Sequence, residues 1–175
     1  MRLINYGLVF GIILFGFTFV KANKSRNFQY KAPANFLVES NLFPSFYPTT
    51  YNHTGAEKVT ILIPPEVRSK VGVPKTKTGE LNKSYLQGKL NFNEQFGIKD
   101  WIMSSYKFTN TSYGERLEIS GSYTSFAGVK TEFLEHHYFG KSTVQSIHLF
   151  YPSVAQGKVV EQAKLSLQTF NPNIN

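Results

Sequence analysis

The chain has 175 residues, a formal net charge of +8 at neutral pH and no cysteine. Hydrophobic residues make up 41% and charged residues 17%, which excludes an intrinsically disordered protein, and the lack of cysteine excludes a small domain held together by disulfides. This size and composition are typical of one globular domain, here residues 23–175, that buries its own core.

Residues 1–22 predict a secretory signal peptide. Arg2 provides a basic start, residues 8–20 are nearly all apolar, and Val20-Lys21-Ala22 has the small residues of a cleavage site. An uncleaved membrane anchor is the alternative, but this apolar stretch is short for a bilayer span, which needs about 20 residues. We therefore expect an exported bacterial protein, periplasmic or secreted, whose mature chain begins near Asn23.

The next segment, residues 23–56, is expected to be irregular because three prolines interrupt any long element. It is rich in aromatic residues: Phe28, Tyr30, Phe36, Phe43, Phe46, Tyr47 and Tyr51. If these side chains stay exposed, they form a contact patch for a protein or a membrane. Large aromatic side chains are mostly buried, however, which favours packing into the core. A β-branched run over residues 58–63 then predicts a strand.

Almost all the net charge of the mature chain lies in residues 67–93. This segment has six basic residues against the single acidic Glu80, whereas residues 94–175 have seven of each sign. Its three glycines and Pro74 predict a long loop that includes a short helix near residues 81–87. The basic residues are Arg68, Lys70, Lys75, Lys77, Lys83 and Lys89.

Concentrated positive charge indicates that these six side chains bind an anionic partner. The candidate partners are phospholipid or phosphoinositide head groups, an acidic envelope polymer and an acidic protein, and peripheral membrane contact would follow from the first of these. The alternative interpretation is a solvated loop whose lysines only aid solubility. Nucleic acid is disfavoured, because the protein is expected to be exported and the segment offers no evident stacking platform.

The last third of the chain predicts an antiparallel meander. In residues 116–124, Leu117, Ile119 and Tyr123 alternate with polar residues, as in a half-buried strand. Gly128 and Gly140 mark turns of hairpin length. The expected strands are residues 98–108, 116–124, 129–139 and 143–151.

An amphipathic helix is expected to close the domain. Ser153 followed by Gln156 fits a capping box at its start. Its apolar face consists of Val159, Val160, Ala163, Leu167 and Phe170. We therefore predict an α+β fold, in which the C-terminal amphipathic helix packs on one face of an antiparallel sheet.

This order of elements resembles the PsbP-like fold. The resemblance covers residues 95–172 and rests on the glycine-turned hairpin, on the last strand ending at Tyr151 and on the closing helix with Leu165-Ser166-Leu167-Gln168-Thr169-Phe170. The family includes the oxygen-evolving-complex P protein of photosynthetic membranes and many small exported bacterial proteins of unknown function. The resemblance implies a non-enzymatic binding or assembly role, and it supplies no catalytic residue.

The run Glu132-Phe133-Leu134-Glu135-His136-His137 is the candidate for metal or catalytic chemistry. Alternation along a strand places Glu132 and His136 on one face, and Glu135 and His137 on the other. His148 on the neighbouring strand could pair with either histidine. Because a zinc site needs three or four ligands, structural histidines are favoured, and we expect no metal and no cofactor.

Catalytic motifs are absent from the rest of the sequence, which has no cysteine nucleophile, G-x-S-x-G elbow, P-loop or dinucleotide fingerprint. A glycosidase pair of Glu115 or Glu118 with Glu132 is disfavoured, because carboxylates on a sheet are mostly solvated.

The sequence therefore favours a non-enzymatic exported module that docks on an anionic partner. Two alternatives remain: a small secreted hydrolase, or a structural subunit of an envelope assembly. The hydrolase would use Glu132, Glu135, His136 or His137.

Overall fold

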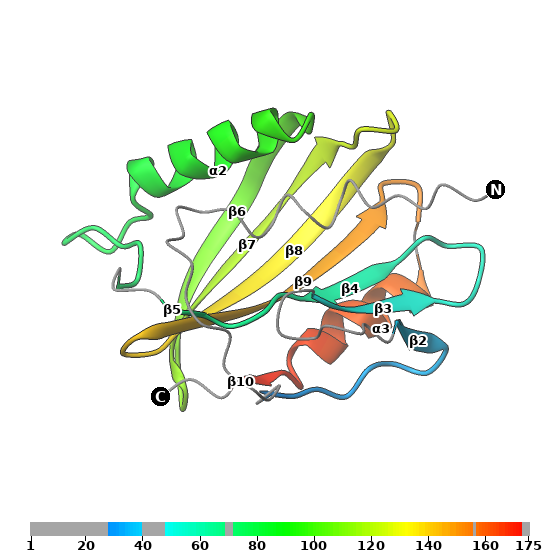
Figure 1. The fold of residues 1–175 in the computed structure, drawn as a ribbon, viewed down its shortest axis with the longest axis horizontal. Helices are drawn as coiled ribbons and strands as arrows, with labels where there is room; N and C mark the ends of the chain where they lie inside the picture. Colours follow the sequence, from blue (N-terminus) through cyan, green and yellow to red (C-terminus); the bar gives the residue numbers. More distant parts are fainter. Residues whose placement is uncertain (1–27, 40–47, 69–71, 156, 173–175) are drawn as a thin grey trace.

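The computed structural model describes residues 28–39, 48–68, 72–155 and 157–172, and these residues form two sheets and two helices (Figure 1). The larger sheet consists of β2 (Phe36–Glu39), β3 (Thr49–His53), β4 (Thr60–Ile63), β5 (Val67–Arg68), β6 (Lys99–Thr111), β7 (Gly114–Thr124), β8 (Lys130–Phe139) and β9 (Thr143–Pro152). The smaller sheet pairs β1 (Phe28–Gln29) with β10 (Asn171–Pro172). The helices are α2 (Lys83–Gln95) and α3 (Lys158–Leu167).

All pairings in the larger sheet are antiparallel, and its strand order is β2-β3-β4-β9-β8-β7-β6, with β5 also paired to β9. With α3 packed on one face, this is the predicted α+β fold. Strands β7 to β9 form the predicted meander, and β6, expected as a strand, extends it by pairing with β7; all four lie within a few residues of their expected bounds.

Two glycines allow this meander to form. Gly128 has a φ of 74°, a conformation that favours glycine, and it turns β7 into β8. Gly121 on β7 lies beside an irregular part of the pairing with β6. A Cβ atom at position 121 would lie 2.0 Å from the carbonyl oxygen of Ile102, so the close approach of the two backbones requires glycine there.

The prediction of an irregular segment over residues 23–56 is wrong for its described part, which contains β1, β2 and β3. None of these short strands contains a proline: β1 precedes Pro33, β2 follows it, and β3 begins after Pro48. Strands β2 and β3 extend the sheet beyond β4. The aromatic residues at positions 28, 30, 36 and 51 pack against the core, as predicted. Phe43, Phe46 and Tyr47 lie outside the described residues.

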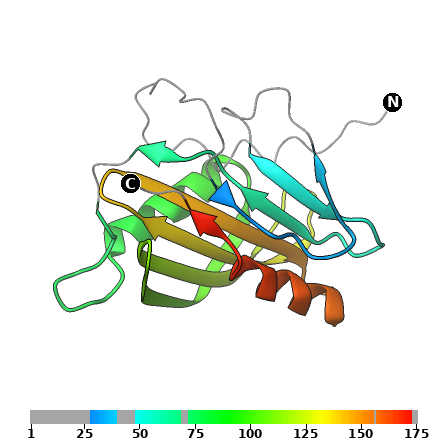
Figure 2. The ribbon, with the colours of Figure 1, turned by 90° about the horizontal axis from the view of Figure 1, so that it is seen from below.

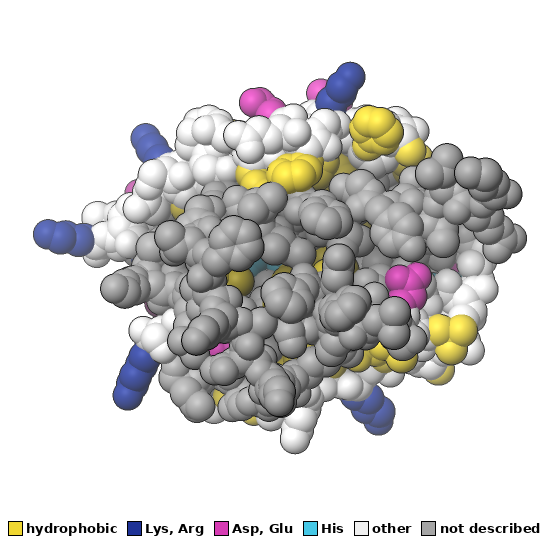
Figure 3. Space-filling model, viewed as in Figure 1, with side chains coloured by type: hydrophobic (Ala, Val, Ile, Leu, Met, Phe, Trp, Pro, Cys, Tyr) yellow, Lys and Arg dark blue, Asp and Glu magenta, His cyan; other side chains and the backbone are white. Residues whose placement is uncertain are grey.

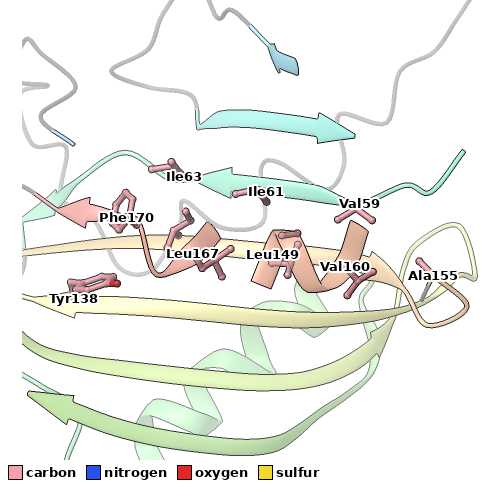
Figure 4. Packing of buried hydrophobic residues seen from close by; sticks show 11 residues of the cluster. Val59, Ile61, Ile63, Tyr138, Leu149, Ala155, Val160, Leu167 and Phe170 are labelled. Carbon is pink, nitrogen blue, oxygen red and sulfur yellow. The ribbon is translucent and has the colours of Figure 1, made fainter. Parts of the chain in front are cut away.

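Helix α3 covers one face of the sheet and encloses the larger hydrophobic cluster (Figures 2 and 4). Figure 4 shows Val160 and Leu167 of the helix beside Leu149 of β9, with Ile61 of β4 nearby. The helix is amphipathic as predicted, but the capping box is wrong. The helix begins at Lys158 after Gly157, since residues 152–155 form a separate turn.

Helix α2 lies on the opposite face, over a smaller cluster of Leu81, Leu117, Ile119, Tyr123 and Phe133. Phe133 and Leu134 are consecutive on β8 and belong to the two different clusters, as strand alternation requires. The helix has 13 residues, starts with an Asn82 cap and is longer than the predicted short helix, so residues 67–93 are not a loop throughout.

None of the helices in the described ranges is long and apolar enough to cross a membrane. The predicted signal peptide, residues 1–22, lies outside those ranges.

Candidate functional site

A cluster of ionisable side chains is buried between α2 and the sheet. Glu135 and His137 extend from β8, His148 from β9 and Lys89 from α2, and their side chains keep only 4–13% of their surface exposed. The β8–β9 register explains the arrangement, because Glu135 pairs with His148 and His137 pairs with Ser146. Alternation along the strands therefore directs all of these side chains to the face that α2 covers.

The carboxylate of Glu135 is the centre of the cluster. Its Oε2 atom accepts a hydrogen bond from Nζ of Lys89 and lies 2.7 Å from Nε2 of His137. Its Oε1 atom lies 3.9 Å from Nδ1 of His148, and Nε2 of His148 lies 2.9 Å from Oγ of Ser146. One carboxylate thus contacts an ammonium and two imidazoles.

The ionisation of the cluster follows from burial and from these contacts. Burial alone would raise the pKa of Glu135, but the Lys89 ammonium and the two histidines hold this pKa well below its usual range. Burial alone would lower the pKa of Lys89, but Glu135 raises it. Burial lowers the pKa of His137, and it lowers that of His148 to about 3. At neutral pH, the cluster therefore contains one ion pair and two neutral imidazoles.

His148 is incompletely paired. Its Nδ1 atom is buried and has no hydrogen-bond partner among the described residues. If Nε2 donates its proton to Oγ of Ser146, then Nδ1 carries a free lone pair on the side of Glu135. A buried polar atom without a partner costs about 1–3 kcal/mol, so a ligand at Nδ1 would relieve this cost.

Glu135, His137 and His148 are the described residues whose side chains could together hold a metal ion, since one ligand atom from each lies within 4.8 Å of the others. The predicted placement of Glu135 and His137 on one face is confirmed, and of the two pairings left open for His148 the structure has the one with His137, because β9 places His148 opposite Glu135. Projecting the register from the hairpin turn at Gly140-Lys141 distinguishes these two pairings, because it places His148 on the same face as Glu135 and His137.

The residues of the alternative hydrolase are divided between the two faces, as strand alternation predicts. Glu132 and His136 lie on the α3 side, where Oε1 of Glu132 accepts a hydrogen bond from Ser153 and Nε2 of His136 lies 3.0 Å from Oε2 of Glu118. Glu135 and His137 lie on the α2 side. No single site therefore contains all four side chains.

The comparisons with known proteins agree with the observed fold. No family model and no curated protein matches the chain. The solution structure of cyanobacterial PsbP (CyanoP) from Synechocystis sp. PCC 6803 is similar over 82% of this chain and 85% of that chain, with a TM-score of 0.54 and 10% identity. The fold is PsbP-like.

A second structure has a similar fold. LpqN, involved in cell envelope biogenesis of Mycobacterium tuberculosis, matches over 83% of each chain, with a TM-score of 0.50 and 11% identity. At such identities, the likeness shows the fold alone. The PsbP-like region extends beyond the predicted residues 95–172, because 82% of the chain includes much of the N-terminal half.

Within the PsbP-like fold, the described members of the predicted anion-binding set do not converge in one cluster. Lys89 is buried against Glu135, and Nζ of Lys75 lies 2.7 Å from Oε1 of Glu115. Lys77 and Lys83 are exposed. Figure 3 shows lysine and arginine side chains at separate points around the outline of the molecule. The side chain of Arg68 and all of Lys70 lie outside the described part of the structure.

Proposed function

We propose that the protein is an exported, non-enzymatic binding module. The PsbP-like fold supports this function, since the similar structures include LpqN, a protein of cell envelope biogenesis. The signal-like residues 1–22 support export. The division of the hydrolase residues between two faces favours binding over hydrolysis by that set.

We further propose that one end of the molecule docks on an anionic surface of phospholipid or phosphoinositide head groups. The loop over residues 72–82 protrudes at this end, where α2 begins (Figure 1). The observation that carries the proposal is that Lys75, Lys77 and Lys83 are all exposed in this short stretch. Lys89 is excluded from the contact set because its charge is already buried against Glu135.

The local charge at the start of α2 adds to this positive region. The first turn of the helix has no acidic residue, so the positive end of the helix dipole is uncompensated there. Each basic residue near an anionic membrane contributes about 1 kcal/mol. Because Lys75 is paired with Glu115, Lys77 and Lys83 would contribute most, and the set would strengthen binding by about 30-fold, with salt weakening it.

The test is sedimentation with phosphatidylcholine vesicles that contain or lack phosphatidylglycerol, at low salt. The variant with Lys75→Gln, Lys77→Gln and Lys83→Gln should lose most binding to the anionic vesicles. The matched control removes the same charge at three exposed positions elsewhere, with Lys107→Gln, Lys130→Gln and Lys158→Gln, and should bind as the native protein does. Equal losses in both variants, or no binding by the native protein, would overturn the docking proposal.

A further inference from the structure

We propose that Glu135, His137 and His148 form a binding site for one Zn²⁺ ion. The ligands are a carboxylate oxygen of Glu135, Nε2 of His137 and Nδ1 of His148, and a water molecule would complete a tetrahedron. This site lies under α2 and is separate from the exposed lysines of the docking surface, so neither proposal depends on the other.

The distances between the ligand atoms fit a zinc site after small side-chain movements. Ligands about 2.1 Å from zinc lie about 3.4 Å from one another in a tetrahedron. In the structure, Oε2 of Glu135 is 2.7 Å from Nε2 of His137, and Oε1 is 3.9 Å from Nδ1 of His148. These two distances involve different oxygens of Glu135. For one ligand atom from each residue the separations are within 4.8 Å, so the side chains need to draw together by about 1.4 Å at most to bind one ion.

The unpartnered nitrogen of His148 is an independent observation that indicates a ligand. Nδ1 is buried without a partner in the described part of the chain, whereas Nε2 lies 2.9 Å from the Ser146 hydroxyl. Histidines that bind zinc almost always donate their other ring N–H to a neighbouring acceptor, which fixes the tautomer. Ser146 provides that acceptor and leaves the Nδ1 lone pair directed at the cluster.

Lys89 shows that the cluster already stabilises a cation. Its ammonium bonds to the carboxylate oxygen that His137 also contacts. Zinc and the ammonium would repel each other at this distance, so zinc binding requires Lys89 to withdraw. Its flexible four-carbon side chain retains 13% exposure, which gives the ammonium a route toward solvent. We therefore infer that Lys89 and the metal compete for Glu135.

The set of two imidazoles and one carboxylate selects the class of metal. Imidazole ligands suit Zn²⁺ and the neighbouring transition metals, whereas Ca²⁺ and Mg²⁺ take oxygen ligands. His137 would bind through Nε2 in the tautomer that carries its proton on Nδ1. The site should therefore bind Zn²⁺ and Co²⁺ but not Ca²⁺.

The test uses protein purified without a histidine tag and freed of metal by a chelator. Calorimetric titration with Zn²⁺ should give one equivalent bound, titration with Ca²⁺ should give no binding, and Co²⁺ should produce the visible absorption of a four-coordinate site. Removing a partner that only positions a zinc ligand costs 10–100-fold in affinity, so His148→Gln or His137→Gln should cost about 100-fold or more. His53→Gln is the control, because His53 lies on β3 outside the cluster.

Lys89→Met separates the metal proposal from a purely structural ion pair. The variant keeps all three ligands and removes the competing charge, so it should bind Zn²⁺ about 10-fold more tightly, and Zn²⁺ should raise its unfolding midpoint more than that of the native protein. This variant also keeps the test decisive if a histidine variant fails to fold. The proposal is wrong if the native protein takes up no Zn²⁺, or if folded His148→Gln binds Zn²⁺ as the native protein does. It is also wrong if Lys89→Met weakens binding.

Discussion

The two faces of the sheet bury different kinds of side chain. The face under α3 holds the larger apolar cluster, with Ile147, Leu149 and Leu167 fully buried. The face under α2 places a smaller apolar cluster next to the ion pair of Lys89 and Glu135. Consecutive residues of the same strands supply both faces. The α3 face mainly stabilises the fold, with His136 as its buried ionisable group, whereas the α2 face holds the buried ion pair and two further histidines.

The two helices differ in the same way. Helix α3 buries Val160, Ala163 and Leu167, whereas α2 has no fully buried residue. Its half-buried Tyr85 and Leu86 pack at the margin of the smaller cluster, and Lys89 provides a buried ion pair to the sheet. The position of α2 should therefore depend on electrostatics more than that of α3 does.

The largest expected effect on stability comes from truncating a side chain on the apolar face under α3. Leu149→Ala removes a side chain that is fully buried between β9 and α3, and the cavity should cost about 4 kcal/mol in the free energy of unfolding. Urea denaturation measures this cost. Leu165→Ala is the matched control, since Leu165 lies on the exposed side of the same helix and should change the stability by less than about 0.5 kcal/mol. Equal costs for the two variants would contradict the assignment of this face.

The next largest effect on stability comes from removing one charge of the ion pair on the face under α2. Lys89→Met leaves the buried Glu135 carboxylate without its ammonium and should destabilise the metal-free protein by about 3 kcal/mol. The double variant Lys89→Met with Glu135→Met removes both charges and should return to within about 1 kcal/mol of the native stability. Urea denaturation of both variants gives the comparison. If the double variant is less stable than Lys89→Met alone, the ion pair is not the source of the cost.

Much of this contrast could be predicted from the sequence, because it follows from local periodicity. The alternation of Leu117, Ile119 and Tyr123 predicted the half-buried β7, and the spacing of Val160, Ala163 and Leu167 predicted the buried face of α3. Such patterns reflect contacts with one dominant apolar surface. The PsbP-like fold could be inferred from the order of these elements.

The charged cluster could not be predicted in the same way, because its members come from three elements. The sequence places Lys89 in a basic segment and gives no sign of its partner, because Glu135 lies 46 positions further along the chain. Helix α2 lacks a strong apolar stripe, and its length was therefore underestimated. Only the register between β8 and β9 brings His148 opposite Glu135.

A smaller effect on stability comes from removing a hydrogen bond between the N-terminal segment and α3. The hydroxyl groups of Tyr30 and Ser166 lie 2.7 Å apart, and burial raises the pKa of Tyr30 to about 12. Tyr30→Phe should cost about 1 kcal/mol, because it removes one hydrogen bond and leaves the packing of the ring. Thermal or urea unfolding measures this change. The control is Tyr113→Phe at an exposed ring, and a similar loss in this variant would argue against the Tyr30 contact.

The smallest effect is a pH dependence on the α3 side, where Glu118 is a partly exposed counterpart of the buried Glu135. The His136 ring, whose Nε2 lies 3.0 Å from Oε2 of Glu118, lowers the pKa of this carboxyl group, and Arg116 and Lys107 lower it further. Because the pKa of Glu118 is lower in the folded protein than in the unfolded chain, the unfolded chain takes up the proton first as the pH falls. The stabilisation by Glu118 is therefore complete above the unfolded value of about 4.3 and is lost as the pH falls through the folded pKa.

Glu118→Gln should accordingly be less stable than the native protein at pH 7, and the difference should disappear in strongly acidic solution. Urea midpoints at neutral and acidic pH measure the difference, and added salt should reduce it because Glu118 is partly exposed. Glu94→Gln on the exposed side of α2 provides the control. If Glu94→Gln shows the same pH-dependent difference, the effect reflects the net charge of the protein, and the contact between Glu118 and His136 contributes little to the stability of the α3 face.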